Sequence, residues 1–316
     1  MKIFSHAPVM LTEVIEGLAL RPGLTVLDGT VGLGGHAGAI LERIGKNGRL
    51  LAIDRDPAQL ARAKDRLRGW KNVEWNAGSY KDATRIAYEH GIRNVDCALL
   101  DLGFASSHVD DPARGFSFQT EGPLDMRYDP SLSFSAADII NTWSAQDLAM
   151  IFSRYGEERH AARLAQAIIA RRRAQPFHTT TDIANFIAEQ RHSDSRRIHP
   201  ATHIFQALRI AVNDELGELR AGLPAIWNLL APGGRLAVIS FHSLEDRIVK
   251  MFMRERVAKG EGACQPKNAQ KPTKEEIRTN PRSRSARLRI IQKYVSTIPQ
   301  NNATRNSTHL HVDAPA

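Results

Sequence analysis

A glycine-rich turn followed by an acid is the stretch of this 316-residue sequence whose spacing points most directly to chemistry. Gly34 and Gly35 follow a short apolar strand predicted at 25–28, and Asp54 ends a second apolar run 20 residues beyond Gly34. Glycines let the backbone turn tightly and approach a ligand, and an acid at this spacing binds ribose hydroxyls in doubly wound folds. The stretch therefore predicts a site for a nucleoside-containing cofactor.

The carboxylate of Asp28 decides between two classes of such cofactors. At the end of the first strand it would repel a pyrophosphate resting on the helix N-terminus, but it would attract the ammonium and sulfonium groups of S-adenosylmethionine. The charge therefore favours S-adenosylmethionine over a nicotinamide dinucleotide. Two simpler roles stay open, in which Gly34 and Gly35 only form a tight turn and Asp28 caps the following helix.

The composition is that of a globular enzyme, with 42% hydrophobic and 24% charged residues. No run has the length of a membrane span and the N-terminus lacks the features of a signal peptide, so we expect a cytoplasmic protein without membrane contact. Cys97 and Cys264 are far apart in sequence. We therefore expect neither a disulfide framework nor a metal site.

The net charge of +9 is concentrated near the C-terminus. The stretch 254–293 carries twelve Lys and Arg against four Glu, a net charge of +8. Because phosphate contacts dominate affinity for nucleic acids, this segment predicts a polyanionic partner. A solvated basic surface is the alternative.

Asp101 ends a further apolar run, 95–101, and is expected at the carboxyl edge of the sheet, where ligands of open α/β sheets bind. A carboxylate there can hold the hydrogens of an exocyclic amine and free its lone pair to attack a methyl carbon, without a strong base.

Tyr80 follows a strand predicted at 73–75, and it could stack on an adenine or be a buried loop aromatic.

Seven motifs follow one another along the chain, namely Asp28-Gly29-Thr30, Gly34-Gly35-His36, Asp101-Leu102-Gly103, Gly122-Pro123-Leu124-Asp125-Met126-Arg127, Phe205-Gln206-Ala207-Leu208-Arg209, Ile239-Ser240-Phe241-His242-Ser243-Leu244-Glu245-Asp246 and Asn280-Pro281-Arg282-Ser283-Arg284-Ser285. With these motifs the sequence resembles, over roughly 5–294, the ribosomal RNA small-subunit methyltransferase H family, also called MraW.

The resemblance implies an α/β fold, a class I Rossmann-like methyltransferase core with an inserted all-helical domain. It also implies transfer of a methyl group from S-adenosylmethionine to the N4 amine of a cytidine in the decoding region of 16S rRNA. The partner would be small-subunit rRNA, within an assembled or nearly assembled 30S subunit or as naked rRNA. The oligomeric state stays open.

The resemblance divides the chain into four segments. We expect 1–110 to be the first part of the methyltransferase domain, 111–202 a loop and the inserted helical domain, 203–295 the remainder of the core with the basic segment, and 296–316 a disordered tail. The insertion is expected to roof the cofactor site.

Within these segments, periodicity predicts amphipathic helices. They are expected at 145–155, 157–173 and 181–191, the last capped by Thr180 or Thr181, and at about 203–230, before a strand at 235–241. The polar segment 258–278 is expected to be mobile until RNA binds, and 286–294 to form a final strand.

The resemblance assigns cofactor contacts residue by residue. Gly34, Gly35 and His36 would surround the methionine end, Asp54 the ribose, Tyr80 the adenine and Asp101 the sulfur, with Asp28 supplying negative charge. His242 would be a hydrogen-bond partner of the target base or a proton acceptor, or it would hold its loop through Glu245 or Asp246. Arg282, Arg284, Arg287 and Arg289 would contact phosphates.

The sequence departs from the family pattern after Asp101-Leu102-Gly103. His108 stands where the family has a glutamine that touches the cofactor, and an imidazole cannot donate and accept as a carboxamide does. Phe104 would either stack on the flipped cytosine or pack beneath the loop.

Three other functional classes remain. A nicotinamide oxidoreductase is disfavoured by Asp28. An RNA-binding protein without activity would transfer no methyl group, and a DNA cytosine methyltransferase would accept DNA without any ribosomal particle.

Overall fold

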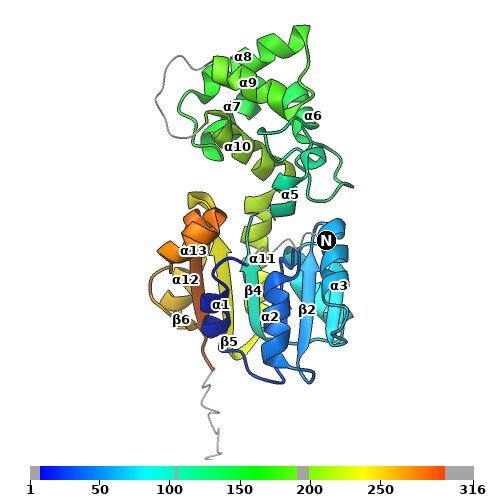
Figure 1. Cartoon of the computed structure of the whole chain (residues 1–316). Helices are drawn as coiled ribbons and strands as arrows, with labels where there is room; N and C mark the ends of the chain where they lie inside the picture. Colours follow the sequence, from blue (N-terminus) through cyan, green and yellow to red (C-terminus); the bar gives the residue numbers. More distant parts are fainter. Residues whose placement is uncertain (1–7, 104–105, 191–198, 296–316) are drawn as a thin grey trace, which may run out of the picture.

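A single seven-stranded sheet organises the computed structural model, which describes residues 8–103, 106–190 and 199–295 (Figure 1). The strand order is β3-β2-β1-β4-β5-β7-β6. The first five strands run parallel, and β7 is antiparallel to both of its neighbours. The strands are β1 (Thr25–Asp28), β2 (Arg49–Asp54), β3 (Val73–Ala77), β4 (Val95–Asp101), β5 (Leu230–Ser240), β6 (Gly262–Cys264) and β7 (Arg287–Lys293).

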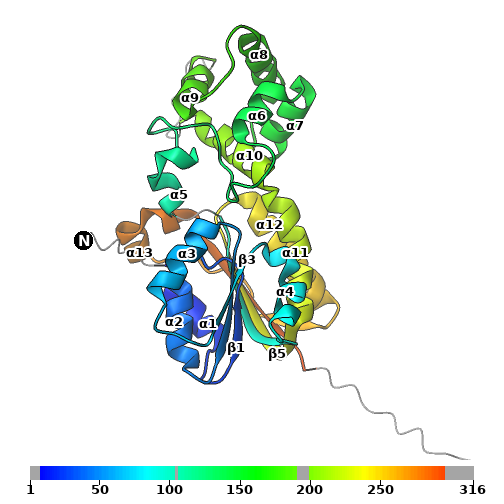
Figure 2. The ribbon, with the colours of Figure 1, turned by 90° about the vertical axis from the view of Figure 1, so that its right-hand side faces the viewer.

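Helices cover both faces of this sheet, which explains why β1, β2 and β4 are almost continuously apolar (Figure 2). One face packs on α1 (Leu11–Leu18), α2 (Gly35–Ile44) and α3 (Pro57–Arg66). The other packs on α4 (Ala83–Glu89), α11 (Glu215–Leu229) and α12 (Ser243–Ala258). The parallel strands with helices on both faces confirm the predicted α/β class.

A separate all-helical lobe stands over the carboxyl ends of the strands (Figure 1). Its hydrophobic cluster is built from α6 (Ala136–Thr142), α7 (Ala145–Arg154), α8 (Ala161–Ala174), α9 (Thr180–Glu189) and α10 (Ala201–Asn213). Helices α7, α8 and α9 lie close to the ranges predicted, whereas α6 was not predicted. The cap of α9 was also misplaced, because the Oγ1 of Thr179 accepts the backbone N–H of Asp182.

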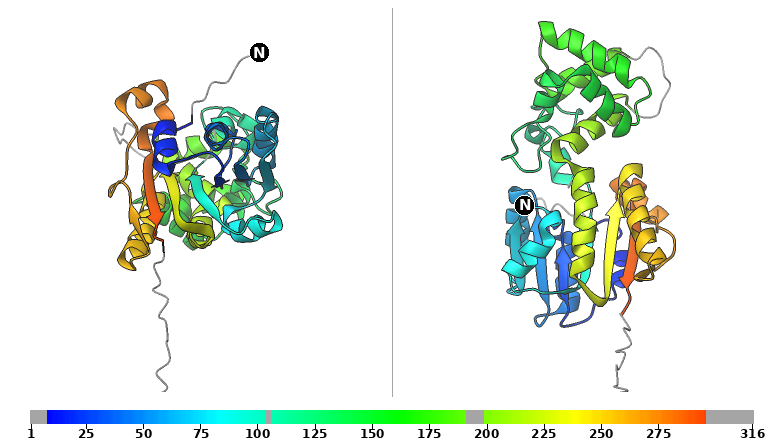
Figure 3. Two further views of the ribbon diagram at one scale, coloured as in Figure 1. Left: turned by 90° about the horizontal axis from the view of Figure 1, so that it is seen from below. Right: turned by 180° about the vertical axis from the view of Figure 1, so that it is seen from behind.

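The single helix expected at about 203–230 is wrong. Asp214 adopts a left-handed backbone conformation with φ of 46°, so the chain breaks there into α10 and α11. Helix α10 buries Ile204, Phe205 and Leu208 in the helical lobe, and the lobe therefore extends beyond the boundary expected at 202. Figure 3 shows α11 descending from this break along the sheet.

Two more expectations need correction. Segment 258–278, predicted to be mobile, is folded: β6 pairs with β7, and α13 (Lys274–Thr279) is tied to the N-terminal segment because Glu276 accepts the N–H of Met10. The strand expected at 235–241 begins earlier, because Leu230 already pairs with Val95 on β4. The disordered tail predicted at 296–316 lies outside the described residues.

No helix in the described part of the chain is long and apolar enough to cross a membrane.

Candidate functional site

A cavity of about 240 Å³ lies at the carboxyl edge of the sheet, where the glycine-rich loop after β1 meets the ends of β2 and β4. Parallel strands present their ligands at this edge. Six of the predicted cofactor residues line the cavity, namely Gly35, His36, Asp54, Tyr80, Asp101 and His108. Gly34 and Asp28 are not among the lining residues.

The glycine turn needs glycine at both predicted positions. Gly34 has φ of 76°, and a Cβ at this position would lie 3.1 Å from Leu67 Cδ1. A Cβ on Gly35 would lie 2.6 Å from the ring of Pro8. Helix α2 begins at Gly35, so its first N–H groups point to the cavity edge.

Asp28 is a buried carboxyl with an unused oxygen. Its Oδ1 accepts the N–H of Thr30 at 3.2 Å, while Oδ2 has no hydrogen-bond partner. The cap proposed as its alternative role is wrong, because α2 is preceded by Gly34 without any side-chain cap. Burial is the main reason why the pKa of Asp28 rises to about 7, with Asp54 adding to the effect.

Asp101 resembles Asp28 in this respect. Its Oδ1 is buried without a partner, and its pKa is raised well above the usual range by burial and by the nearby Asp28 and Glu245. His36 stands beside it. The Nε2–H of His36 donates to the carbonyl of Val9 at 3.0 Å, so its Nδ1 faces Asp101 Oδ2 at 3.5 Å.

These groups make a cavity suited to a cation. Burial lowers the pKa of His36 to about 4, so the imidazole is neutral at pH 7 and does not compensate the two acids. The unpaired oxygen of Asp101 at the cavity wall therefore matches the positive groups of S-adenosylmethionine, and that of Asp28 adds a second acid directly before the lining residues Gly29 and Thr30.

Asp54 is held rigidly at the end of β2. Its Oδ2 accepts the N–H of Gly32 at 2.7 Å, and its Oδ1 accepts the N–H of Asp56 at 2.8 Å. Each carboxylate oxygen keeps a second lone pair for a ligand. The ribose contact stays a prediction.

Tyr80 lies in the short 3-10 helix Tyr80–Asp82 and is 7% exposed. Its ring packs on α11 so closely that a Cβ on Gly222 would lie 2.4 Å from Cδ2. It is thus a buried aromatic that also lines the cavity, and the adenine contact stays a prediction.

His108, in α5 (Ser106–Asp110), is turned toward the core. Its Nε2 lies 2.7 Å from Asp56 Oδ2, which also accepts a bond from Arg114 Nη1 at 2.7 Å. The ring stacks on Phe116 and contacts Tyr128. His108 therefore ties the loop to the core, and its cofactor contact stays a prediction. Phe104 lies outside the described residues.

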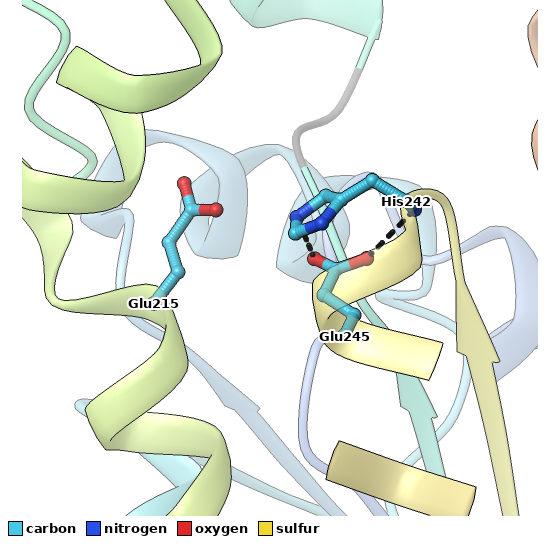
Figure 4. Close-up of side chains that lie close together, drawn as sticks. All are labelled: Glu215, His242 and Glu245. Carbon is cyan, nitrogen blue, oxygen red and sulfur yellow. Dashed lines mark hydrogen bonds and ion pairs between the residues drawn. The ribbon is translucent and has the colours of Figure 1, made fainter. Parts of the chain in front are cut away.

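Three side chains that could share a ligand face one another across the site (Figure 4). Glu215 begins α11, whereas His242 and Glu245 lie at the start of α12, and their ligand atoms are within 4.8 Å of one another. His242 Nε2 lies 3.1 Å from Glu245 Oε1, while Glu245 Oε2 accepts the N–H of Phe241. The alternative in which His242 holds its loop through Glu245 thus has direct contacts.

Glu215 is already engaged. Its Oε1 accepts the hydroxyl of Tyr128 at 3.0 Å and lies 2.8 Å from Arg209 Nε, and its Oε2 accepts Arg209 Nη2. A cation at this cluster would have to displace a buried arginine, so we assign no metal to it. The sequence did not predict Glu215 as a site residue, because it lies 27 residues upstream of His242 and belongs to no recognised motif.

Comparison of the chain with known proteins identifies its family. The model of the MraW methylase family matches residues 3–294. The chain belongs to the MraW methylase family. A relative from Thermomicrobium roseum, named ribosomal RNA small subunit methyltransferase H, is 48% identical over 305 residues, which cover 92% of this chain and 94% of the relative. S-adenosylmethionine is the cofactor of this methylase, and the unpaired acidic oxygens at the cavity suit its positive charge.

Solved structures also align with the methylase. An rRNA methylase from Streptococcus thermophilus is 11% identical, with a TM-score of 0.42, over 92% of this chain and 99% of that chain. A SAM-dependent O-methyltransferase from Thermotoga maritima is 9% identical, with a TM-score of 0.42, over 90% of this chain and 64% of that chain.

The predicted phosphate-binding arginines of the methylase differ in their surroundings. Arg289 forms a mostly buried ion pair with Asp246 at 2.8 Å, and its phosphate contact stays a prediction. Arg282 donates to Asp110 at 2.7 Å. Arg284 and Arg287 are exposed and form no ion pair with any described residue.

The Asp56 contacts lead to a stability prediction. Burial alone would raise the pKa of Asp56, but the hydrogen bonds from His108 and Arg114 outweigh it and lower the pKa to about 2. Its contribution to stability is therefore present above about pH 4 and is lost as the pH falls toward 2. Asp56→Ala should lower the free energy of unfolding in urea by about 3 kcal/mol at pH 7, because it leaves buried donors unpaired.

The matched control is Asp65→Ala. Asp65 is 83% exposed and lies 3.8 Å from Arg68, so its loss should leave the urea midpoint nearly unchanged. Equal midpoints for the two variants would contradict the role given to Asp56.

Proposed function

We propose that this methylase transfers the methyl group of S-adenosylmethionine to the exocyclic N4 amine of a cytidine in the decoding region of 16S small-subunit rRNA. The name of the 48% identical relative supports the rRNA substrate. The observation that supports an amine as acceptor is the buried, unpaired oxygen of Asp101 beside the cation-binding cavity. Such a substrate would place the protein in the cytoplasm.

Asp101 has the central role in this proposal. The lone pair of a cytosine amine is delocalised into the ring, and an acceptor that draws its hydrogens out of the ring plane frees that pair for attack. S-adenosylmethionine supplies the electrophilic methyl group when bound. Asp101 lies at the end of β4, where its backbone N–H donates to Thr30 Oγ1 at 2.7 Å, so the backbone that carries the carboxyl group is held in place.

His242 is proposed to receive the proton. As the N–CH₃ bond forms and the S–CH₃ bond breaks, the nitrogen becomes acidic and loses one N–H proton. Nδ1 of His242 has no hydrogen-bond partner among the described residues, and the Glu245 carboxylate, 3.1 Å from Nε2, would stabilise the resulting imidazolium.

RNA binding is assigned to the basic C-terminal segment and the helical lobe. Replacing Arg284 and Arg287 together by alanine should weaken RNA binding and make log Kd less dependent on log salt by about 1.4, because each phosphate contact with a single strand contributes about 0.7. Filter binding at several salt concentrations measures this slope.

Arg278→Ala is the matched control, since Arg278 is exposed nearby but already bound to Glu275. A salt slope that is the same for the double variant and the unaltered protein would remove these arginines from the RNA interface.

Transfer of labelled methyl to small subunits that lack base methylation, followed by nucleoside analysis, tests the proposal. We expect N4-methylcytidine in the digest of 16S rRNA. Parallel reactions with naked 16S rRNA, assembled 30S subunits and DNA identify the form of the substrate. Label in another nucleoside, or only in DNA, would overturn the assignment.

A further inference from the structure

Gln59 is a buried polar residue to which the proposed function gives no role. It lies in the first turn of α3 and is 2% exposed. Its Nε2 donates to Ser107 Oγ at 2.6 Å, and its backbone N–H donates to Asp56 Oδ1 at 3.3 Å. The side-chain oxygen, Oε1, is buried and has no hydrogen-bond partner.

Gln59 lies near the part of the cavity where the ribose is expected to bind. Helix α3 begins three residues after Asp54, and Gln59 lines the same cavity as Asp54 and Gly32. Its neighbour His108 is directed to Asp56, and the Ser107 hydroxyl is bound to the Gln59 amide. No described side chain therefore satisfies the Gln59 oxygen, although the residue lies at the cavity wall.

An orphaned buried acceptor has an energetic cost. Leaving a buried carbonyl without a donor costs about 1–3 kcal/mol, and native proteins retain few such groups without a reason. The other unpaired oxygens at this site belong to Asp28 and Asp101, whose carboxyl groups match the cationic end of the cofactor. The uncharged amide oxygen of Gln59 matches an uncharged donor.

We propose that Gln59 binds the cofactor, with its Oε1 accepting a hydrogen bond from a ribose hydroxyl of the S-adenosyl group alongside Asp54. Adenosine offers two kinds of uncharged donor, the ribose hydroxyls and the adenine amine. Gln59 follows the ribose acid in the chain, whereas the adenine side is assigned to Tyr80 on the opposite face of the sheet. The inference rests on the proposed placement of the ribose at Asp54.

Gln59→Met tests the contact, because methionine keeps the length of the side chain and removes the oxygen. Binding of S-adenosylhomocysteine, measured by calorimetry without RNA, should weaken about fivefold, as expected for one hydrogen bond. The melting temperature of the free protein should stay the same or rise, because the orphaned oxygen is gone. A purely structural residue would instead lower the melting temperature and leave the affinity unchanged, and that result would overturn the proposal.

Ser107→Ala is the matched control. It removes the same hydrogen bond to Gln59 Nε2 but keeps Oε1, so S-adenosylhomocysteine should bind within about twofold of the unaltered protein. A loss equal to that of Gln59→Met would show that the hydrogen bond to Ser107, rather than the oxygen, matters.

Two ligand analogues identify the donor. The 2′-deoxy and 3′-deoxy forms of S-adenosylhomocysteine each lack one ribose hydroxyl. For one of them the unaltered protein and Gln59→Met should bind with equal affinity, because the partner of the oxygen is already missing. If Gln59→Met weakens both analogues as much as the parent ligand, the ribose assignment is wrong. Because no RNA is present, these results are independent of whether the rRNA substrate is correct.

Discussion

Replacing Asp101 by asparagine should lower the rate of methyl transfer by about 100-fold or more, because the variant loses an acceptor aimed at the reacting amine. The amide nitrogen of asparagine would present hydrogens to a substrate nitrogen that carries hydrogens of its own. Folding should not suffer, because Oδ1 of Asp101 has no hydrogen-bond partner that the substitution would remove. Single-turnover transfer to small subunits, with the cofactor saturating, measures the chemical step.

Asp96→Asn is the matched control for this experiment. Asp96 lies on the same strand, β4, at its far end, where its Oδ2 accepts the N–H of Thr25 at 2.8 Å. An asparagine oxygen can accept the same bond, so full activity is expected. Transfer by Asp101→Asn at more than about a tenth of the normal rate would show that Asp101 does not act on the amine.

The affinity for S-adenosylmethionine should rise about tenfold between pH 6 and pH 8. The pKa of Asp28 is raised to about 7, mainly by burial, so the carboxyl is mostly protonated at pH 6 and mostly charged at pH 8. A cationic ligand binds the charged form better, and binding therefore releases a proton. Calorimetry in buffers of different ionisation enthalpy measures both the affinity and the number of protons released.

Asp28→Asn should abolish most of this pH dependence, while Asp101 and Asp54, the neighbouring acids, account for what remains. S-adenosylhomocysteine lacks the sulfonium charge and should show a weaker dependence in the unaltered protein. Affinity that falls as the pH rises from 6 to 8 would contradict a carboxylate site for the cation.

The same shift predicts the stability of the ligand-free protein. Because the folded pKa of Asp28 lies above its unfolded value, its contribution to stability is complete below about pH 4 and is lost as the pH rises through about 7. S-adenosylmethionine should restore stability at the upper end of this range, where the free carboxylate is least well accommodated.

Several site residues were predictable because their signal is local. Short apolar runs and turn residues predict the glycines at 34 and 35, the helix that follows them, and the acids that end β2 and β4. The family resemblance added the helical insertion, which periodicity alone could not have placed over the sheet. The break at Asp214 was missed because a single left-handed residue leaves the helical pattern of its neighbours almost unchanged.

By itself the sequence determined the α/β class and the order of the glycine loop and acids, and it predicted a site for a cationic cofactor, because these depend on neighbouring residues and on local charge. Only the tertiary structure decided which polar groups remain unpaired. Gln59 meets Ser107 across 48 positions, Asp56 meets Arg114 across 58, and Glu215 faces Glu245 from another helix. The pairing of a buried polar group depends on such distant neighbours, which periodicity and spacing do not encode.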